Sequence, residues 1–224
     1  MTEHKVVNSK HMADRRTYGD RCGIARALDV VGERWALLIV RELLLGPKRF
    51  TDLRAGLPGV SSDILTARLR DLDAAGVVTR DKLPPPAASQ VYELTARGKA
   101  LEPVILELGR WGSVAPFPAG DDVQIGSDAV VVALKTLFDP AMANDLDAEL
   151  ELRLNGDVFA ARVHDGKFDV ARGRAGDPQS TITATPGVLA ATLWHGRKPD
   201  EEFAVDGRWT TVNRFLKLFP LPGS

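Results

Sequence analysis

A helix that runs directly into a two-stranded hairpin is the feature that most constrains the fold of this chain. Ser61 can cap the helix, and Leu65, Leu69 and Leu72 recur at helical spacing, so they predict an inward apolar stripe. Gly76 ends the helix. The segments "VVTRDKL" and "QVYEL" are typical of strands, and the proline-rich "PPPAAS" between them predicts a turn. A helix held beside such a hairpin is positioned to meet a partner.

Three helices are expected before this element and one after it. The segments are "CGIARALDVV", then "ERWALLIVRELLL", which is apolar nearly all round, then "FTDLRAGL" and finally "TARGKALEPVILELGRWG". Thr95 caps the last helix, and Pro103 predicts a kink in it. Helix, turn, helix and hairpin in this order form the winged helix-turn-helix arrangement, in which the second helix enters the DNA major groove.

Beyond a proline- and glycine-rich linker the pattern changes. An apolar helix, "AVVVALKTLF", precedes the alternating segments "AELELRL", "VFAARV", "FDVARG" and "STITAT", which predict strands. "TPGVLAATLWHG" predicts a helix capped by Thr185, "FAVDGRW" a short turn, and "TTVNRFLKLF" a final helix. This is an α+β pattern: an antiparallel sheet with one face covered by helices. The expected organisation is a flexible arm at 1–20, a winged helix domain at 21–112, a linker at 113–124 and an α+β domain at 125–224.

Charge divides the chain in the same way. Residues 1–120 hold 18 lysines and arginines against 14 acidic residues, and the remainder holds 11 against 16. A mildly basic half joined to an acidic half indicates two domains with different partners. The single cysteine, Cys22, excludes an internal disulfide, and no signal peptide or membrane span is expected, so the sequence favours a cytoplasmic protein.

Enzymatic signatures are missing from the sequence. The four histidines share no metal-ligand spacing, and there is no phosphate loop, dinucleotide fingerprint or nucleophile elbow. The sequence therefore predicts neither an enzyme, nor a metal site, nor a cofactor.

Small polar and long basic side chains mark the expected DNA-binding surface. Short side chains at the start of the second helix allow close approach, and arginines can neutralise phosphates or read guanine. The alternative is that Ser61 is only a cap and the arginines are solvated surface. The expected DNA-binding residues are Ser61, Ser62, Asp63, Thr66, Arg68, Arg70, Arg80 and Lys82.

Residues 22–112 resemble the DNA-binding domain of HxlR-type transcriptional regulators. The resemblance is carried by "C..ARALDVVGERW.LLI.REL..GP.RF..L", "LPG.S...L..RLR.L...G.V.R" and "VYELT..G". It implies a homodimer joined through the first and last helices of the domain, recognition by residues 61–70 and a wing near Lys82–Ser89. In a dimer the two recognition helices address half-sites about one helical turn apart, so the operator is expected to be near-palindromic. The wing tip has no basic residue between Lys82 and Arg97, so a strong phosphate contact from its end is not expected.

Cys22 has two interpretations. In some members of the HxlR family a cysteine at this place senses oxidants, and a helix N-terminus with Arg21 and Arg26 nearby would favour its thiolate. The alternative, which is the commoner state of a free cysteine, is a small half-buried side chain at the edge of the dimer.

Residues 125–224 are similar to the sterol-carrier-protein-like domain, through "LELRLNGDVFAARVHDGKFDVARG", "DPQSTITATPGVLAATLWHG" and "AVDGRWTTVNRFLKLF". The similarity implies a tunnel for an apolar ligand beneath the helices; the alternatives are an ordinary core and closure of the interface between domains. It leaves a rival to DNA binding, in which the protein carries an apolar ligand and its first domain serves only for dimerisation. The expected tunnel residues are Val131, Leu134, Phe138, Leu189, Leu193, Trp194, Phe215 and Phe219.

Overall fold

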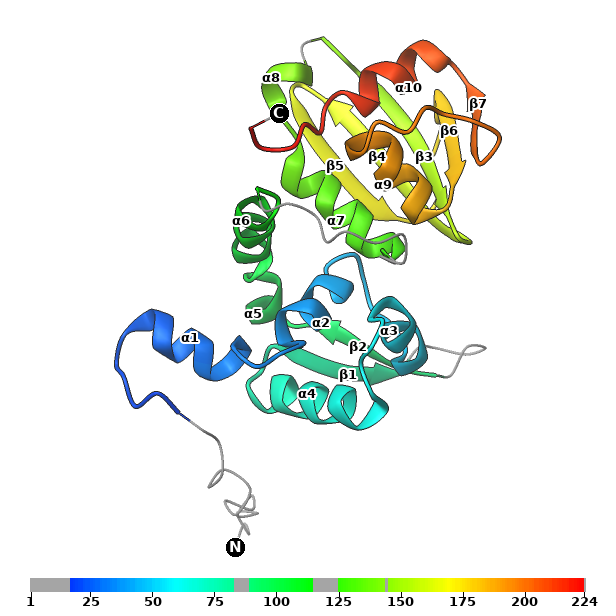
Figure 1. Ribbon diagram of the computed structural model, residues 1–224. Coiled ribbons are helices and arrows are strands. Elements are labelled where there is room, and N and C mark those ends of the chain that lie inside the picture. The colour runs from blue at the N-terminus through cyan, green and yellow to red at the C-terminus, as the bar shows by residue number, and fades with distance from the viewer. Residues whose placement is uncertain (1–16, 83–88, 115–124, 144, 224) are drawn as a thin grey trace, which may run out of the picture.

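The computed structural model describes residues 17–82, 89–114, 125–143 and 145–223. They form two domains that are packed against each other, with the hairpin and the helix-turn-helix in the first and a larger sheet in the second (Figure 1). Most of the expected arm and linker and the tip of the hairpin lie outside the described residues.

The N-terminal domain has the expected order of helices around a two-stranded antiparallel hairpin. Its central helix, α2, is buried along most of its length, as its apolar composition predicts. The bounds are α1 Gly23–Val31, α2 Ala36–Leu43, α3 Phe50–Gly56, α4 Ser62–Ala74, β1 Val78–Lys82, β2 Gln90–Leu94, α5 Ala96–Lys99 and α6 Glu102–Gly112.

The expected last helix of this domain is two helices. Thr95 caps α5, since its hydroxyl accepts a hydrogen bond from the backbone N–H of Gly98 at 3.1 Å. The chain then leaves α5 after Lys99 and begins α6 at Glu102, with Pro103 in the first turn. Proline has no N–H, so it cannot extend the hydrogen bonds of a preceding helix. The predicted disturbance at Pro103 is confirmed, and the prediction of one continuous helix is wrong.

The C-terminal domain is an α+β fold, as expected, and Figure 1 shows α7, α9 and α10 on one side of its five-stranded sheet. Inward-facing residues of the strands and apolar residues of these helices form its core. The bounds are α7 Ser127–Leu137, α8 Pro140–Ala143, β3 Ala148–Leu154, β4 Asp157–His164, β5 Lys167–Arg172, β6 Ser180–Ala184, α9 Pro186–Trp194, β7 Phe203–Gly207 and α10 Trp209–Leu216.

Two details of this sheet differ from the expectation. The strands pair in the order β5-β4-β3-β6-β7, and β6 runs parallel to β3, so the sheet is mixed rather than wholly antiparallel. The parallel pair arises because the chain crosses from β5 at one edge to the far side of β3. The segment predicted as a short turn is β7, in which Val205 pairs opposite Ile182 and the side chain of Phe203 is buried. Burial of that ring explains why the segment joins the sheet.

Helix α7 connects the two domains through its packing. Nine of its eleven residues are buried, which requires partners on more than one side. It contacts β5 and α9 in its own domain and α2, α3 and α6 in the other. Gly109 allows α6 to approach closely, since a Cβ at this position would lie 3.1 Å from Cγ2 of Thr136. Consequently the buried apolar residues of both domains form one contiguous cluster.

The face of the sheet opposite the helices is crossed by residues 173–179, and Glu151 anchors this crossing. Arg153 Nε donates to Oε1 of Glu151 at 2.8 Å, and the backbone N–H of Ala175 donates to Oε2 at 3.1 Å. The hydrogen bond from Arg153 is the main reason that the pKa of Glu151 lies below its ordinary value of 4.5, and it outweighs burial, which acts in the opposite direction.

Glu151 should make the stability of the fold depend on acid pH. Because its pKa is lower in the folded chain than in the unfolded chain, its contribution is present above pH 4.5 and is lost as the pH falls through the folded value. We expect Glu151→Gln to lower the free energy of unfolding by about 1 kcal/mol at neutral pH and by less in acid. Urea denaturation over a pH series measures this, with the exposed Glu201→Gln as control. An equal loss at neutral and acid pH would contradict it.

Candidate nucleic-acid interface

Helix α4 is fixed to the domain by one face and capped at its start. Leu65, Leu69 and Leu72 are fully buried, which confirms the predicted stripe. Ser61 is the N-cap, and its Oγ accepts a hydrogen bond from the backbone N–H of Ile64 at 3.3 Å. Both interactions hold α4 in one orientation, so its outer face presents a fixed set of side chains.

The outer face of α4 carries Asp63, Thr66 and Arg70, all exposed. Their spacing of three and four residues places them on one stripe of the helix. Thr66 Oγ1 donates to the carbonyl of Ser62 at 2.8 Å, and Ser62 itself is half-buried. In Figure 1 α4 lies on the side of its domain opposite the C-terminal domain, so that domain does not cover the stripe.

The two arginines of α4 have different surroundings. Arg68 points back towards the domain, where its guanidinium lies 3.1 Å from Asp71 and 3.6 Å from Glu33 in the turn between α1 and α2. Arg70 is exposed, and no ion pair or hydrogen bond of its side chain occurs among the described residues. Arg70 is therefore available to an external partner, whereas Arg68 is engaged within the chain.

In the hairpin, Arg80 lies along Tyr92 of the neighbouring strand. Its Nη2 donates to the hydroxyl of Tyr92 at 2.9 Å, and its guanidinium carbon is 5.2 Å from the ring centroid. Arg80 is exposed, so this contact orients a charge that solvent still reaches. Lys82 ends β1 and pairs with Gln90. Of the expected wing, residues 83–88 lie outside the described part of the chain.

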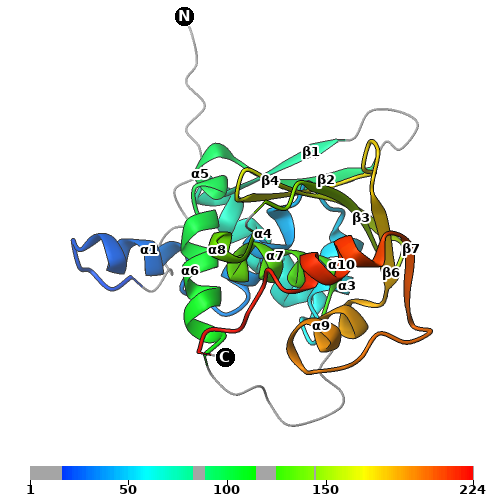
Figure 2. The ribbon, with the colours of Figure 1, turned by 90° about the horizontal axis from the view of Figure 1, so that it is seen from above.

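Two helices of this domain expose apolar side chains. Helix α1 projects from the body of the molecule (Figures 1 and 2), and Ile24 on it is 73% exposed. On α6, Val104, Leu108 and Trp111 form an exposed stripe. Cys22 is the N-cap residue of α1 and is exposed, so it is not half-buried within one copy of the chain.

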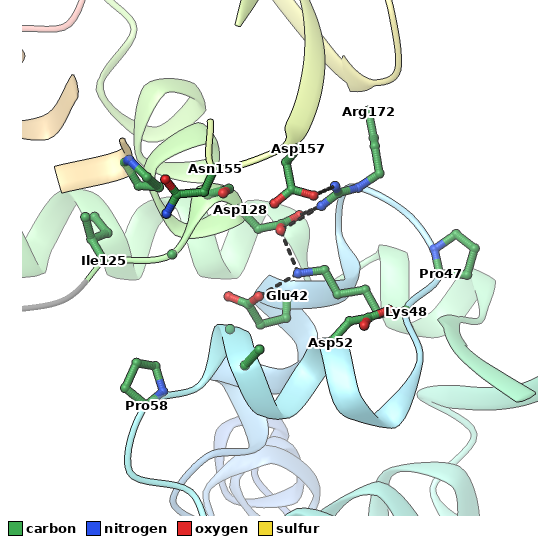
Figure 3. A pocket seen from close by; sticks show the side chains of 15 residues that line it. Glu42, Pro47, Lys48, Asp52, Pro58, Ile125, Asp128, Asn155, Asp157 and Arg172 are labelled. Atoms are coloured by element: carbon green, nitrogen blue, oxygen red, sulfur yellow. Dashed lines mark hydrogen bonds and ion pairs between the residues drawn. The ribbon is translucent and has the colours of Figure 1, made fainter. Parts of the chain in front are cut away.

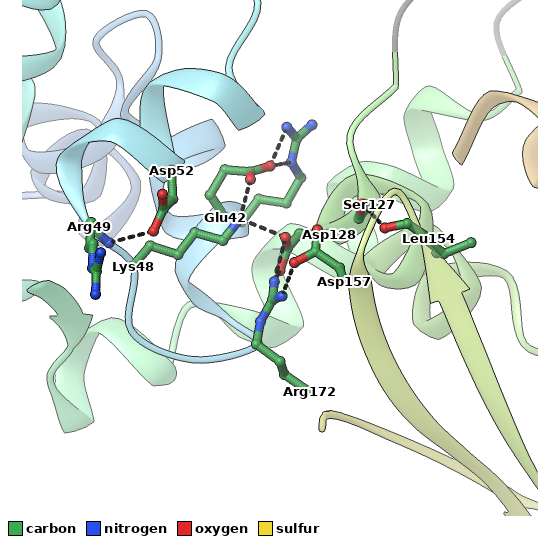
Figure 4. Close-up of polar contacts among 10 residues, drawn as sticks. Glu42, Lys48, Arg49, Asp52, Ser127, Asp128, Leu154, Asp157 and Arg172 are labelled. Atoms are coloured by element: carbon green, nitrogen blue, oxygen red, sulfur yellow. Dashed lines mark hydrogen bonds and ion pairs between the residues drawn. The ribbon is translucent and has the colours of Figure 1, made fainter. Parts of the chain in front are cut away.

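The junction between the domains contains a chain of alternating charges (Figures 3 and 4). Lys48 Nζ lies 2.7 Å from Oε2 of Glu42 on α2 and 2.6 Å from Oδ2 of Asp128 in the first turn of α7. On the other side, Arg172 reaches both oxygens of Asp128, at 2.6 and 2.7 Å, and Asp157 at 2.5 Å. Glu42 and Asp128 are almost fully buried, so the two ion pairs of Lys48 are largely shielded from water, whereas Arg172 and Asp157 are partly exposed.

Further contacts at the junction between the domains keep the charges of Glu42 and Arg172 paired. Arg41 donates to Oε1 of Glu42 at 2.8 Å, so both oxygens of this carboxylate have a partner. Burial alone would lower the pKa of Arg172, but its hydrogen bonds with Asp128 and Asp157 outweigh burial and raise the pKa above the ordinary value, so the guanidinium stays charged. Gly56 leaves room for this arrangement, since a Cβ there would lie 2.2 Å from the Glu42 carboxylate.

A cavity of about 480 Å³ opens beside these charges, between α2 and α3 of one domain and α7 and the β3–β4 turn of the other (Figure 3). Its lining includes Asp52, Ile125 and Asn155 besides the paired charges. Within the described residues, no group of three or more His, Cys, Asp or Glu side chains is placed to hold a metal ion, and no helix is long and apolar enough to cross a membrane.

Comparison with known proteins identifies the family to which the N-terminal half of the chain is similar. Residues 30–116 match the family described as HxlR-like helix-turn-helix. The Bacillus subtilis (strain 168) protein named uncharacterized HTH-type transcriptional regulator YvaP is 41% identical over 88 residues, which cover 39% of this chain and 82% of YvaP. The chain belongs to the HxlR-like helix-turn-helix family. It is therefore a helix-turn-helix transcriptional regulator, a DNA-binding class of protein.

Other relatives match the same part of this HxlR-like chain. The HTH-type transcriptional regulator YodB of Bacillus subtilis (strain 168) is 36% identical over 97 residues, covering 43% of this chain and 86% of YodB. The solved structure of reduced YodB aligns at 32% identity with a TM-score of 0.39, over 45% of this chain and 100% of that one. The redox regulator HypR in its oxidized form aligns at 33% identity with a TM-score of 0.39, over 43% and 100%.

In the C-terminal domain of this HxlR-like chain, the expected tunnel residues lie in or against the core. Aromatic rings fill much of the space beside them: the centroids of Phe138 and Phe168 are 5.5 Å apart, and those of Phe215 and Phe219 5.0 Å apart. Trp194 Nε1 donates to the carbonyl of Phe219 at 3.0 Å. Fully buried are Val131, Leu134, Leu189, Phe215 and Phe219, while Phe138, Leu193 and Trp194 are partly buried.

Sequence reasoning did not find the charged junction. One signal was present, because Glu42 is an acidic residue inside the apolar segment "ERWALLIVRELLL" and a buried carboxylate needs a cation. Its partner Lys48 is six residues away, but Asp128 is 80 residues from Lys48 and Arg172 another 44 from Asp128. Pairs so distant cannot be identified from spacing.

Proposed function

We propose that this regulator acts in the cytoplasm as a homodimer that places α4 in the major groove of a near-palindromic operator. The observation that carries the proposal is the stripe of Asp63, Thr66 and Arg70, which α4 exposes on the side away from the C-terminal domain. Its inner leucines are buried and its start is capped, so the stripe is presented by a rigid element. A rigid, uncovered helix face following a helix-turn is the arrangement that reads base edges.

The role that we propose for each residue follows from the length of its side chain and from the contacts that this side chain makes within the chain. Asp63 and Thr66 are short and lie near the start of α4, so they meet base edges. A carboxylate can accept from the amino group of cytosine. Arg70 is long and unengaged, and it meets either a phosphate or a guanine. Arg80 and Lys82 contact the adjacent backbone from the hairpin. Arg68 supports α4 through Asp71 and Glu33.

Dimerisation is supported by the exposed apolar side chains of α1 and α6. Ile24, Leu108 and Trp111 are 73%, 47% and 77% exposed in a single copy. Apolar stripes of this kind on a soluble domain mark association surfaces, and a second copy offers the same surface under two-fold symmetry. Two copies would place their α4 helices about one turn of DNA apart, roughly 34 Å.

For the C-terminal domain we propose a sterol-carrier-like role, in which an apolar small molecule binds beneath α9 and α10 and modulates the regulator. The support is the apolar core between these helices and the sheet, which includes Leu189, Leu193 and Phe215. Since aromatic rings pack there, the ligand would enter by displacing them. The rival function is an apolar-ligand carrier whose first domain only dimerises, and binding to DNA distinguishes the two.

Arg70→Ala should weaken DNA binding by about 1–3 kcal/mol if the side chain reads a base, or lower the salt slope by about one if it holds a phosphate. Arg68→Ala is the matched control on the same helix, and we expect it to bind close to wild type because Arg68 is engaged within the chain. Titrations at several salt concentrations, on a duplex selected by the wild type and on random DNA, measure this. If Arg70→Ala binds both DNAs as the wild type does, Arg70 does not face DNA, and if the wild type selects no duplex, the rival carrier function is favoured.

Light scattering should give twice the chain mass for the wild type at micromolar concentration. Leu108→Glu should shift it to the monomer, because a charge in the exposed stripe of α6 would be buried without a partner. Met142→Glu, also exposed but on the C-terminal domain, should leave the dimer intact. A monomeric wild type would contradict the dimer.

A fluorescent fatty acid should bind the full-length protein and be displaced by its unlabelled form. Leu189→Trp should reduce the binding, because a larger side chain beneath α9 occupies the proposed space. Saturable binding that Leu189→Trp leaves unchanged would place the ligand elsewhere, and a wild type that binds none would contradict the ligand role.

A further inference from the structure

Lys48 contacts both the hairpin of its own domain and the C-terminal domain. Its backbone pairs with Tyr92 on β2: Lys48 N–H donates to the Tyr92 carbonyl at 3.0 Å, and Tyr92 N–H donates to the Lys48 carbonyl at 2.8 Å. Its side chain points the other way along the molecule, to Asp128 at the start of α7 (Figure 4). One residue thus joins the base of the hairpin to the C-terminal domain.

The contacts continue from Tyr92 to the outer surface. Arg80 donates to the Tyr92 hydroxyl and lies over its ring, so the orientation of this exposed cation depends on where Tyr92 sits. From Arg172 through Asp128, Lys48 and Tyr92 to Arg80, each neighbour is joined by an ion pair or a hydrogen bond. The contacts are therefore continuous from the C-terminal sheet to the proposed DNA-binding surface.

Burial makes the middle of this series sensitive to change. Lys48 is 9% exposed and Asp128 is 3% exposed, so the ammonium has little water to replace a lost carboxylate. Because losing Asp128 would leave the Lys48 ammonium with Glu42 alone, a displacement of Asp128 would draw Lys48 with it. The backbone of Lys48, which is bonded to β2, would then move as well. A second interdomain ion pair, Lys135 with Glu102, joins α7 to α6, and within the described part of the hairpin neither residue has such a bond to it.

We propose that Lys48 is a positioning residue through which the C-terminal domain sets the hairpin relative to α4. This inference rests on the proposed DNA binding. Displacement of α7, by a ligand or a partner of the C-terminal domain, would move Asp128 and thereby Lys48, Tyr92 and Arg80. The hairpin is thus the part of the DNA-binding surface that responds to the C-terminal domain, while α4 is held by its own buried leucines.

Lys48→Met and Asp128→Asn test this in the full-length protein. After Lys48→Met, Glu42 keeps Arg41 and Asp128 keeps Arg172, so each carboxylate retains a partner and the fold should persist. We expect each variant to weaken binding to the selected duplex about fivefold. The double variant should lose less than the product of the two, because both remove the same coupling. Hydrogen exchange at the Lys48 and Tyr92 amides should become faster.

Lys135→Met is the matched control, since it removes an interdomain lysine of the same kind away from the hairpin; it should change neither DNA affinity nor exchange at Tyr92.

If Arg70→Ala loses affinity while Lys48→Met and Asp128→Asn bind as the wild type, the coupling is wrong and the DNA-binding proposal stands. If Lys135→Met weakens binding as much as Lys48→Met, loosening of the domains in general explains the effect, and the role of Lys48 is again wrong. If the wild type binds no duplex, the DNA-binding proposal fails. The exchange measurement then decides the coupling alone, and unchanged exchange at Tyr92 in Lys48→Met would overturn it.

Discussion

The arrangement of the two domains depends on the ion pairs of Asp128, a buried carboxylate at the start of α7. A carboxylate that is 3% exposed must be matched by cations, and here one comes from each domain, Lys48 and Arg172. An unpaired buried charge costs several kcal/mol. The relative position of the two domains that gives Asp128 both of its cationic partners is therefore favoured. Apolar packing of α7 against α2, α3 and α6 supplies the area, and the charges supply the specificity.

This arrangement leaves the proposed DNA-binding helix α4 uncovered by the C-terminal domain. The C-terminal domain packs on the side of α2 and α3, while α4 lies on the opposite side of its domain. Helix α1 projects from the body of the molecule (Figure 2), and Ile24 and Leu28 on it are exposed. A dimer formed there would therefore meet DNA without rearrangement of the domain junction. The backbone pairing of Lys48 with Tyr92 is then the contact that joins the domain junction to the proposed DNA-binding surface.

Local signals in the sequence were sufficient for most elements of the N-terminal domain, although not for the division of its last helix into α5 and α6. The cap at Ser61, the stripe through Leu69 and the paired strands β1 and β2 each depend on neighbours in the chain, so spacing predicts them. The disturbance at Pro103 follows in the same way from the missing N–H.

Features that depend on distant contacts were not predicted. The edge strand β7 forms because the ring of Phe203 is buried against a sheet built from earlier segments, and β6 runs parallel to β3 because the chain crosses the sheet. Arg68 pairs with Asp71, one helical turn away, and also lies 3.6 Å from Glu33, and only this second contact, with a residue 35 positions earlier, lay beyond what helical spacing can predict. Glu42 signalled a buried cation, but only the fold brings Asp128 to Lys48.

Hydrogen–deuterium exchange with and without the selected duplex tests most directly whether α4 and the hairpin face DNA while the junction stays closed. We expect slower exchange on DNA binding in α4 and in β1 and β2, with α7 slow in both states. Protection confined to the C-terminal domain, with exchange in α4 unchanged by DNA, would contradict it.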